Sequence, residues 1–60
     1  MTYKMTDVLN FIGNVTYVQF EDSCILYTTN GWLEEYGNIK VDVANVQHHH
    51  NGTNTLILKR

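Results

Sequence analysis

Apolar and polar residues alternate over much of this chain, and the alternation has the period of a β-strand. Residues 15–20 (VTYVQF) and 24–29 (CILYTT) are rich in β-branched and aromatic residues, which suit a pleated, half-buried surface better than a helix. Between them lie the acidic residues Glu21 and Asp22, which predict a turn. We therefore expect a central antiparallel hairpin, in which the alternation buries Cys24 as a structural thiol.

The next turn signal is an Asn-Gly pair at positions 30–31. Both residues accept the positive φ that a tight hairpin turn requires. The pair predicts a third strand over residues 32–36, which places Trp32, Glu34 and Tyr36 on one face. Part of an aromatic face is therefore expected near solvent.

Residues 39–43 have the strictest alternation in the chain. They predict a strand that buries Ile39, Val41 and Val43 and leaves its other face in water. The period then shifts by one residue at positions 44–46, which indicates a β-bulge.

The two ends of the chain complete the predicted sheet. A second Asn-Gly pair at positions 51–52 predicts a turn into a last strand over residues 53–58. Near the N-terminus, residues 6–12 form a short helix in one interpretation, and residues 8–12 form a first strand in the other. We predict one mainly β domain over residues 1–60, an antiparallel five-stranded barrel or a strongly bent sheet, SH3-like or Sm-like. If residues 6–12 are helical, a short N-terminal helix precedes the five strands.

Composition narrows the class of protein. A domain of 60 residues buries only about 60% of its unfolded surface, and a single cysteine excludes intramolecular disulfides, so we expect a homo-oligomer. The formal net charge of −2 argues against nonspecific nucleic-acid binding, which depends on clustered Lys and Arg. No secretory signal and no apolar run of about 18 residues occurs, so we expect a cytoplasmic chain without a membrane contact.

The predicted order of elements resembles that of the Sm-like family, small open β-barrels that follow a short helix and assemble into rings. Three stretches carry the resemblance: Gly31-Trp32-Leu33, Tyr36-Gly37-Asn38-Ile39 and Asn51-Gly52-Thr53-Asn54. They are similar to the family's strand start, to its aromatic-x-Asn-hydrophobic loop and to its second signature, in which Asn51 replaces an arginine. The resemblance implies single-stranded RNA binding, with Tyr36 stacking on a base, Asn38 donating or accepting hydrogen bonds, and Asn51 and Gly52 completing the pocket. Turn formation explains the same Asn and Gly residues without homology.

The run of three histidines is the one candidate for a metal site. On a strand, His48 and His50 share a face and His49 lies opposite. Zinc needs three or four ligands, and Cys24 is the only further soft ligand. Nothing in the spacing brings Cys24 to the histidines, so we expect a polar loop, no metal and no cofactor.

No motif indicates catalysis: the chain has no nucleophile elbow, no phosphate-binding glycine loop and no paired carboxylates in an apolar setting. The predicted third strand instead indicates a protein-binding surface. Trp32 and Tyr36 would anchor the partner and Glu34 and Glu35 would form the rim, because interface energy concentrates in desolvated aromatic residues. Trp32 has the alternative role of a core residue.

The acidic turn of Glu21 and Asp22 is the second part of the predicted surface. We therefore expect a non-enzymatic binding protein that acts through protein–protein interaction. A regulator or inhibitor of a larger protein fits, as in small proteins of phages, other viruses and mobile elements. The alternative is an Sm-like oligomer that binds single-stranded RNA.

Overall fold

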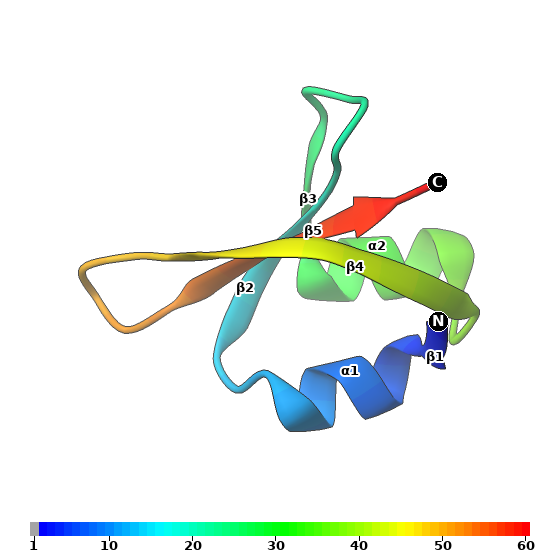
Figure 1. Ribbon diagram of the computed structural model, residues 1–60, viewed down its shortest axis with the longest axis horizontal. Coiled ribbons are helices and arrows are strands. Elements are labelled where there is room, and N and C mark those ends of the chain that lie inside the picture. The colour runs from blue at the N-terminus through cyan, green and yellow to red at the C-terminus, as the bar shows by residue number, and fades with distance from the viewer. Residues whose placement is uncertain (1) are drawn as a thin grey trace.

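Two helices lie on one face of a five-stranded mixed sheet in the computed structural model, which describes residues 2–60 (Figure 1). The elements, in chain order, are β1 Tyr3–Lys4, α1 Met5–Phe11, β2 Val15–Phe20, β3 Leu26–Thr28, α2 Thr29–Tyr36, β4 Lys40–His48 and β5 Asn54–Lys59. The strands are arranged in the order β1-β4-β5-β2-β3. The mainly β class is confirmed, but β1 and β3 remain as two separate edges, so the sheet is not closed into a barrel.

The central hairpin is confirmed, with a shorter second strand than the sequence predicts. β2 pairs antiparallel with β3, and the register places Val18 opposite Tyr27. The turn at Glu21 and Asp22 is present, and β3 begins only at residue 26. Cys24 therefore lies before the strand and is exposed, so the predicted burial of its thiol is wrong.

The N-terminal segment is a helix, as the first of its two interpretations predicts. α1 buries Val8, and both Leu9 and Ile12 pack against the core, as the spacing of one helical face requires. Asn14 then takes a φ of 57°, a left-handed conformation that Asn tolerates better than most residues. This residue turns the chain from α1 into β2.

The predicted third strand is wrong, because residues 29–36 form the helix α2. The Thr28 hydroxyl accepts a hydrogen bond from the Gly31 N–H at 3.1 Å and caps the helix. A Cβ at Gly31 would lie 2.9 Å from that hydroxyl oxygen, so glycine permits the cap rather than a hairpin turn. At the other end Gly37, with a φ of 74°, stops the helix.

The spacing of the aromatic residues explains the error. Trp32 and Tyr36 are four residues apart, and this spacing puts two side chains on one face of a strand and also of a helix. In the structure Trp32 is buried and Tyr36 half-buried, whereas Glu34 is exposed. A strand would have put Glu34 on the same face as the two rings.

The all-antiparallel sheet is also wrong, because β2 and β5 are parallel neighbours, with Val18 opposite Leu56. A parallel pair needs a long crossover, usually one that contains a helix. The segment between the two strands contains α2, which supplies this crossover. With residues 32–36 assigned to a strand, the sequence offers no such connection.

The predicted C-terminal hairpin is confirmed with shifted strand ends. β4 runs antiparallel to β5, and its register shifts between Val43 and Asn45, which confirms the bulge. Val41 is buried and Val43 half-buried, but Ile39 precedes the strand and is 47% exposed, so its predicted burial is wrong. In the turn, the N–H of Gly52 donates to the His49 carbonyl at 3.1 Å and its φ is 82°.

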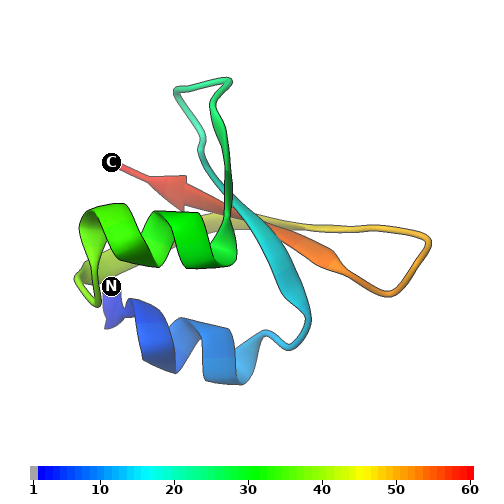
Figure 2. The ribbon, with the colours of Figure 1, turned by 180° about the vertical axis from the view of Figure 1, so that it is seen from behind.

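One hydrophobic core joins both helices to the sheet. The view from behind shows the backbone of the two helices beside the sheet (Figure 2). Its fully buried members include Met5 from α1, Trp32 from α2 and Leu56 from β5. The Trp32 indole Nε1 is buried there without a hydrogen-bond partner among the described residues. Both helices therefore share one side of the sheet.

The Thr28 cap of α2 gives the first prediction. Thr28→Ala removes the acceptor for the Gly31 N–H, and losing such a cap typically costs about 1 kcal/mol. Thr28→Ser keeps the hydroxyl and should cost clearly less. Urea denaturation followed by far-UV circular dichroism measures both free energies of unfolding. Equal losses in the two variants would contradict the cap.

Candidate functional site

The face of the sheet opposite the helices, here called the open face, is the candidate site. Along β2, Val18 and Phe20 are buried in the core, so Tyr17 and Gln19 point to the other side by the alternation of a strand. Along β5, Leu56 is buried in the core in the same way. None of the described helices covers the resulting surface of outward side chains.

The strand register arranges the open face in two rows. Each row crosses β3, β2, β5 and β4 in that order, and takes one residue from each strand. The first row is Thr28, Tyr17, Thr55 and Gln47, and the second is Leu26, Gln19, Ile57 and Asn45. Neighbouring side chains within such a row are in contact distance, so the two rows form one continuous surface.

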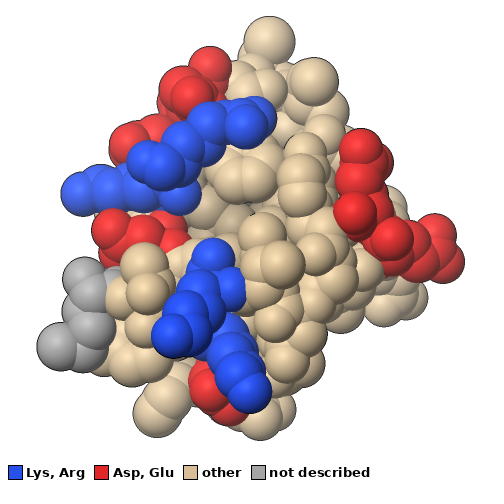
Figure 3. Space-filling model, turned by 90° about the vertical axis from the view of Figure 1, so that its right-hand side faces the viewer, with Lys and Arg blue, Asp and Glu red and all other residues tan. Residues whose placement is uncertain are grey.

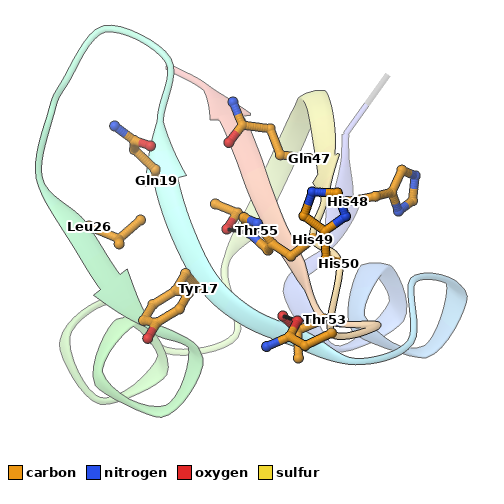
Figure 4. Close-up of a pocket in the computed structure, with 10 residues that line it drawn as sticks. Tyr17, Gln19, Leu26, Gln47, His48, His49, His50, Thr53 and Thr55 are labelled. Carbon is orange, nitrogen blue, oxygen red and sulfur yellow. Dashed lines mark hydrogen bonds between the residues drawn. The ribbon is translucent and has the colours of Figure 1, made fainter.

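A groove of about 760 Å³ lies over the first row from Tyr17 to Gln47 and extends to Gln19 and Leu26 of the second row. Figure 4 shows Tyr17, Gln19 and Leu26 on one side of it and Gln47 on the other. The end of the β4–β5 hairpin that carries His48, His49 and His50, here called the histidine hairpin, lies at the end of the groove. Tyr17 is 38% and Leu26 53% exposed. A second hollow of about 350 Å³ adjoins the groove and includes Gln19, Gln47 and Glu21.

The histidines shape one end of the groove. His49 Nε2 lies 2.6 Å from the Thr55 hydroxyl, and Thr55 is only 3% exposed. His48 Nδ1 lies 2.6 Å from the Asn54 side-chain oxygen. Each of these rings thus satisfies a polar group of β5, and His50 is exposed at the turn.

The lining of the groove contains no Asp, Glu, Lys or Arg among the described residues. The basic side chains lie elsewhere: Lys4 is opposite Lys40 in the β1–β4 pair, Lys59 is opposite Asp42, and Arg60 is the fourth. On the side of the molecule shown in Figure 3, the Lys and Arg side chains form two small groups with acidic side chains beside them. No broad basic surface is visible there.

The binding surface predicted on a strand over residues 32–36 lies on α2 and is only partly exposed. Trp32 is 0% exposed and belongs to the core, which agrees with its alternative role. Glu34 and Glu35 are exposed and Tyr36 is half-buried. All of them lie in the helical layer, on the other side of the sheet from the groove.

An aromatic cluster holds Tyr36 in place. Its ring centroid lies 4.9 Å from that of Trp32, 5.6 Å from that of Phe20 and 5.8 Å from that of Tyr27. The hydroxyls of Tyr36 and Tyr27 are 3.3 Å apart. This hydrogen bond is the main cause that raises the pKa of Tyr27 above its usual value.

Of the predicted acidic turn, Glu21 borders the open face and Asp22 does not. Asp22 Oδ1 accepts a hydrogen bond from Arg60 Nε at 3.0 Å, and the Arg60 guanidinium lies 4.1 Å above the Phe20 ring. Both partners of the ion pair are more than half exposed, so the pair adds about 1 kcal/mol at most to stability.

The residues of the RNA-binding alternative are not brought together. Tyr36 and Asn38 precede β4, and Asn51 and Gly52 follow it, so the two halves lie at opposite ends of a nine-residue strand. Asn38 Oδ1 accepts from the Thr6 N–H at 2.9 Å. The side chain of Asn51 is bonded to Thr53 within its own turn.

No three His, Cys, Asp or Glu side chains within residues 2–60 gather in a way that could hold a metal ion. His48 and His50, the weak candidates, have no third ligand beside them, and Cys24 lies before β3. Half of the ten residues that line the groove were not singled out by sequence: Tyr17, Gln19, Leu26, Gln47 and Thr55. The usable signal was the alternation along β2, which separates Tyr17 and Gln19 from the core positions.

Within residues 2–60, no helix is long and apolar enough to cross a membrane. Comparison of the chain with protein-family models, with curated proteins and with solved structures found no match. The geometry of the open face is therefore the basis for a functional conclusion.

The Tyr27–Tyr36 hydrogen bond predicts a shift in an alkaline titration. Tyr36→Phe removes the hydroxyl, so the pKa of Tyr27 should fall toward the ordinary tyrosine value of about 10. Because the folded pKa is raised, the bond stabilises the fold below about pH 10, and the effect disappears as pH rises through the raised value. NMR of labelled tyrosine rings measures the titration, and an unchanged Tyr27 curve would contradict the contact.

The histidine hairpin gives a prediction about metals. The rings of His48 and His49 are bonded to β5 side chains, so the fold should not depend on a metal. EDTA should leave the Tm unchanged in differential scanning calorimetry. A large drop that zinc reverses would show a metal-dependent fold.

Proposed function

We propose that this chain is a non-enzymatic binding protein that contacts a larger protein through the open face and thereby regulates or inhibits it. The observation that supports this proposal is the uncovered sheet surface, whose groove has no Asp, Glu, Lys or Arg in its lining and exposes Tyr17 and Leu26. The centres of protein interfaces are depleted of charge and enriched in aromatic residues. The groove on the open face matches the first property, with no Asp, Glu, Lys or Arg in its lining, and it contributes one exposed aromatic ring, Tyr17. The helical layer instead carries Glu34 and Glu35 at its surface.

The chemistry of the groove describes the partner. Tyr17 and Leu26 offer apolar contact, and Gln47 has an exposed amide that both donates and accepts hydrogen bonds. The neighbouring Gln19 already donates its side-chain amide to the Ser23 carbonyl at 2.8 Å, which holds this side chain in place. A partner segment with apolar side chains, few charges and exposed hydrogen-bonding groups fits such a surface.

A hydrolytic role has one superficial argument, the 2.6 Å contact between His49 Nε2 and the Thr55 hydroxyl. A base beside a hydroxyl is the arrangement that activates a nucleophile. The Thr55 side chain must then be accessible to a substrate, but Thr55 is 3% exposed. The contact is better explained as a hydrogen bond that satisfies a buried hydroxyl.

Single-stranded RNA binding has weaker support than protein binding. Its predicted pocket residues, Tyr36 and Asn38 on one side and Asn51 on the other, are at opposite ends of β4. The open face has one tyrosine for stacking and no Lys or Arg in its groove. Backbone phosphates need such cations, because counterion release supplies most nonspecific affinity.

The test is capture of a partner from the native host lysate with wild-type and variant chains, before and after nuclease treatment. Tyr17→Thr removes the exposed ring but keeps a residue that favours strands. It should weaken binding of the captured protein at least tenfold, about 1.4 kcal/mol, in a titration with the purified partner. Leu26→Thr should act in the same direction.

Phe11→Ala is the matched control, because Phe11 is an aromatic side chain that is 85% exposed on α1, in the helical layer. It should bind like the wild type. Equal binding by folded Tyr17→Thr and wild-type chains would contradict the open face as the site. Recovery that nuclease abolishes would favour the RNA alternative.

A further inference from the structure

β4 has an unpaired edge over most of its length. On one side β4 pairs with β5 from Asp42 to His48. On the other side β1 pairs only with Lys40 and Val41, and no other described strand lies there. Figure 1 shows β1 beside one end of β4 and the β4–β5 hairpin extending away from the helices.

The backbone direction along this edge follows from the hydrogen bonds of the hairpin. The His49 N–H donates to the Thr53 carbonyl at 2.9 Å, and backbone groups in an antiparallel pair point alternately toward and away from the neighbouring strand. Gln47 therefore bonds to β5, and Val46 and His48 direct their N–H and C=O groups outward. In agreement, the Val46 N–H bonds to the Asn45 side chain at 2.8 Å rather than to β5.

The side chains of this edge do little to block pairing. Natural edge strands are protected by Lys, Pro, charges or bulges, and residues 43–48 (VANVQH) contain no Lys, Arg, Asp, Glu or Pro. Two protective features exist, the bulge after Val43 and the Asn45 side chain on the Val46 N–H. The bulge leaves residues 45–48 as a regular segment, in which the Asn45 side chain must release the Val46 N–H before another strand can pair there.

We propose that this edge is the site at which a second copy of the chain binds, by antiparallel pairing of the two β4 strands. The outward N–H and C=O groups of one strand must face those of the other strand. Val46 of each copy therefore lies opposite His48 of the other. The two-fold axis then passes between the two Gln47 residues, perpendicular to the sheet. Such an interface is isologous, the commonest arrangement in homodimers.

A second copy suits this edge for reasons of charge and of stability. Identical strands place identical charges near each other across a two-fold axis, and residues 43–48 are free of Lys, Arg, Asp and Glu. A domain of 60 residues without a disulfide also has little core of its own. Pairing gives the outward backbone groups of Val46 and His48 strand partners, with the Val46 N–H exchanging the Asn45 side chain for a carbonyl of the other copy, and it adds buried surface.

The symmetry has a consequence for the open face. An axis perpendicular to the sheet keeps the helices of both copies on one side. The two open faces then adjoin on the other side through Gln47, which lines the groove of each copy. The dimer presents one continuous binding surface of twice the size, and its assembly is measurable without any partner.

The test uses charge at the two-fold axis. Gln47 is exposed, so Gln47→Lys and Gln47→Glu should both fold. Each variant alone places like charges directly opposite one another, about 4.5 Å apart between Cα atoms for a pair of this type. We expect wild type to be a dimer at tens of micromolar, each variant to dissociate at least tenfold more readily, and an equimolar mixture of the two to recover the dimer.

A cross-link provides the second measurement. In a Cys24→Ser background, Gln47→Cys places two thiols at the axis within the range of a disulfide, whereas Glu34→Cys on α2 is the control. Mild oxidation should join the first variant into a covalent dimer and leave the second mostly monomeric.

Light scattering and sedimentation equilibrium give the masses. A wild-type monomer at tens of micromolar, or a mixture of Gln47→Lys and Gln47→Glu that stays monomeric while wild type is dimeric, overturns the proposal. Equal cross-linking at positions 47 and 34 also overturns it. These outcomes leave the open-face proposal intact, because that proposal is tested by partner binding to Tyr17 and Leu26 variants.

Discussion

The number of apolar side chains available for burial is the constraint on which this structure depends. Sixty residues supply one cluster, built around Trp32, Leu56 and Met5, and this cluster holds α1 and α2 against the same side of the sheet. A small domain has too little apolar surface to cover both faces of its sheet. One face is therefore fully used for stability and the other remains in solvent.

The exposed features of the molecule follow from that one-sided core. β2 and β5 lie in the interior of the sheet, where each pairs with two neighbours, and their outward residues form the floor of the groove. β4 is longer than the β1 strand beside it, so part of its edge stays unpaired. The same shortage of chain thus leaves both a face and an edge available for a partner.

Local pattern was reliable where only one periodicity fits the residues. The strand of residues 15–20, the turn at positions 51–52 and the bulge after Val43 were all predictable, because alternation and turn chemistry are short-range properties. It was unreliable at Trp32 and Tyr36, whose spacing of four satisfies both a strand and a helix. That one ambiguity also concealed the crossover, and with it the parallel pairing of β2 and β5.

By itself, the sequence determined the mainly β class, the central hairpin, the C-terminal hairpin and the N-terminal helix as one of two interpretations. It also determined that Tyr17 and Gln19 alternate with Val18 and Phe20, without showing which pair lies inside. Only the tertiary structure decided that Trp32 is core, that Cys24 is exposed, and that the groove combines residues of β2, β3, β4 and β5. The physical reason is that strand order and the covered face depend on contacts between residues far apart in the chain, to which local periodicity is insensitive.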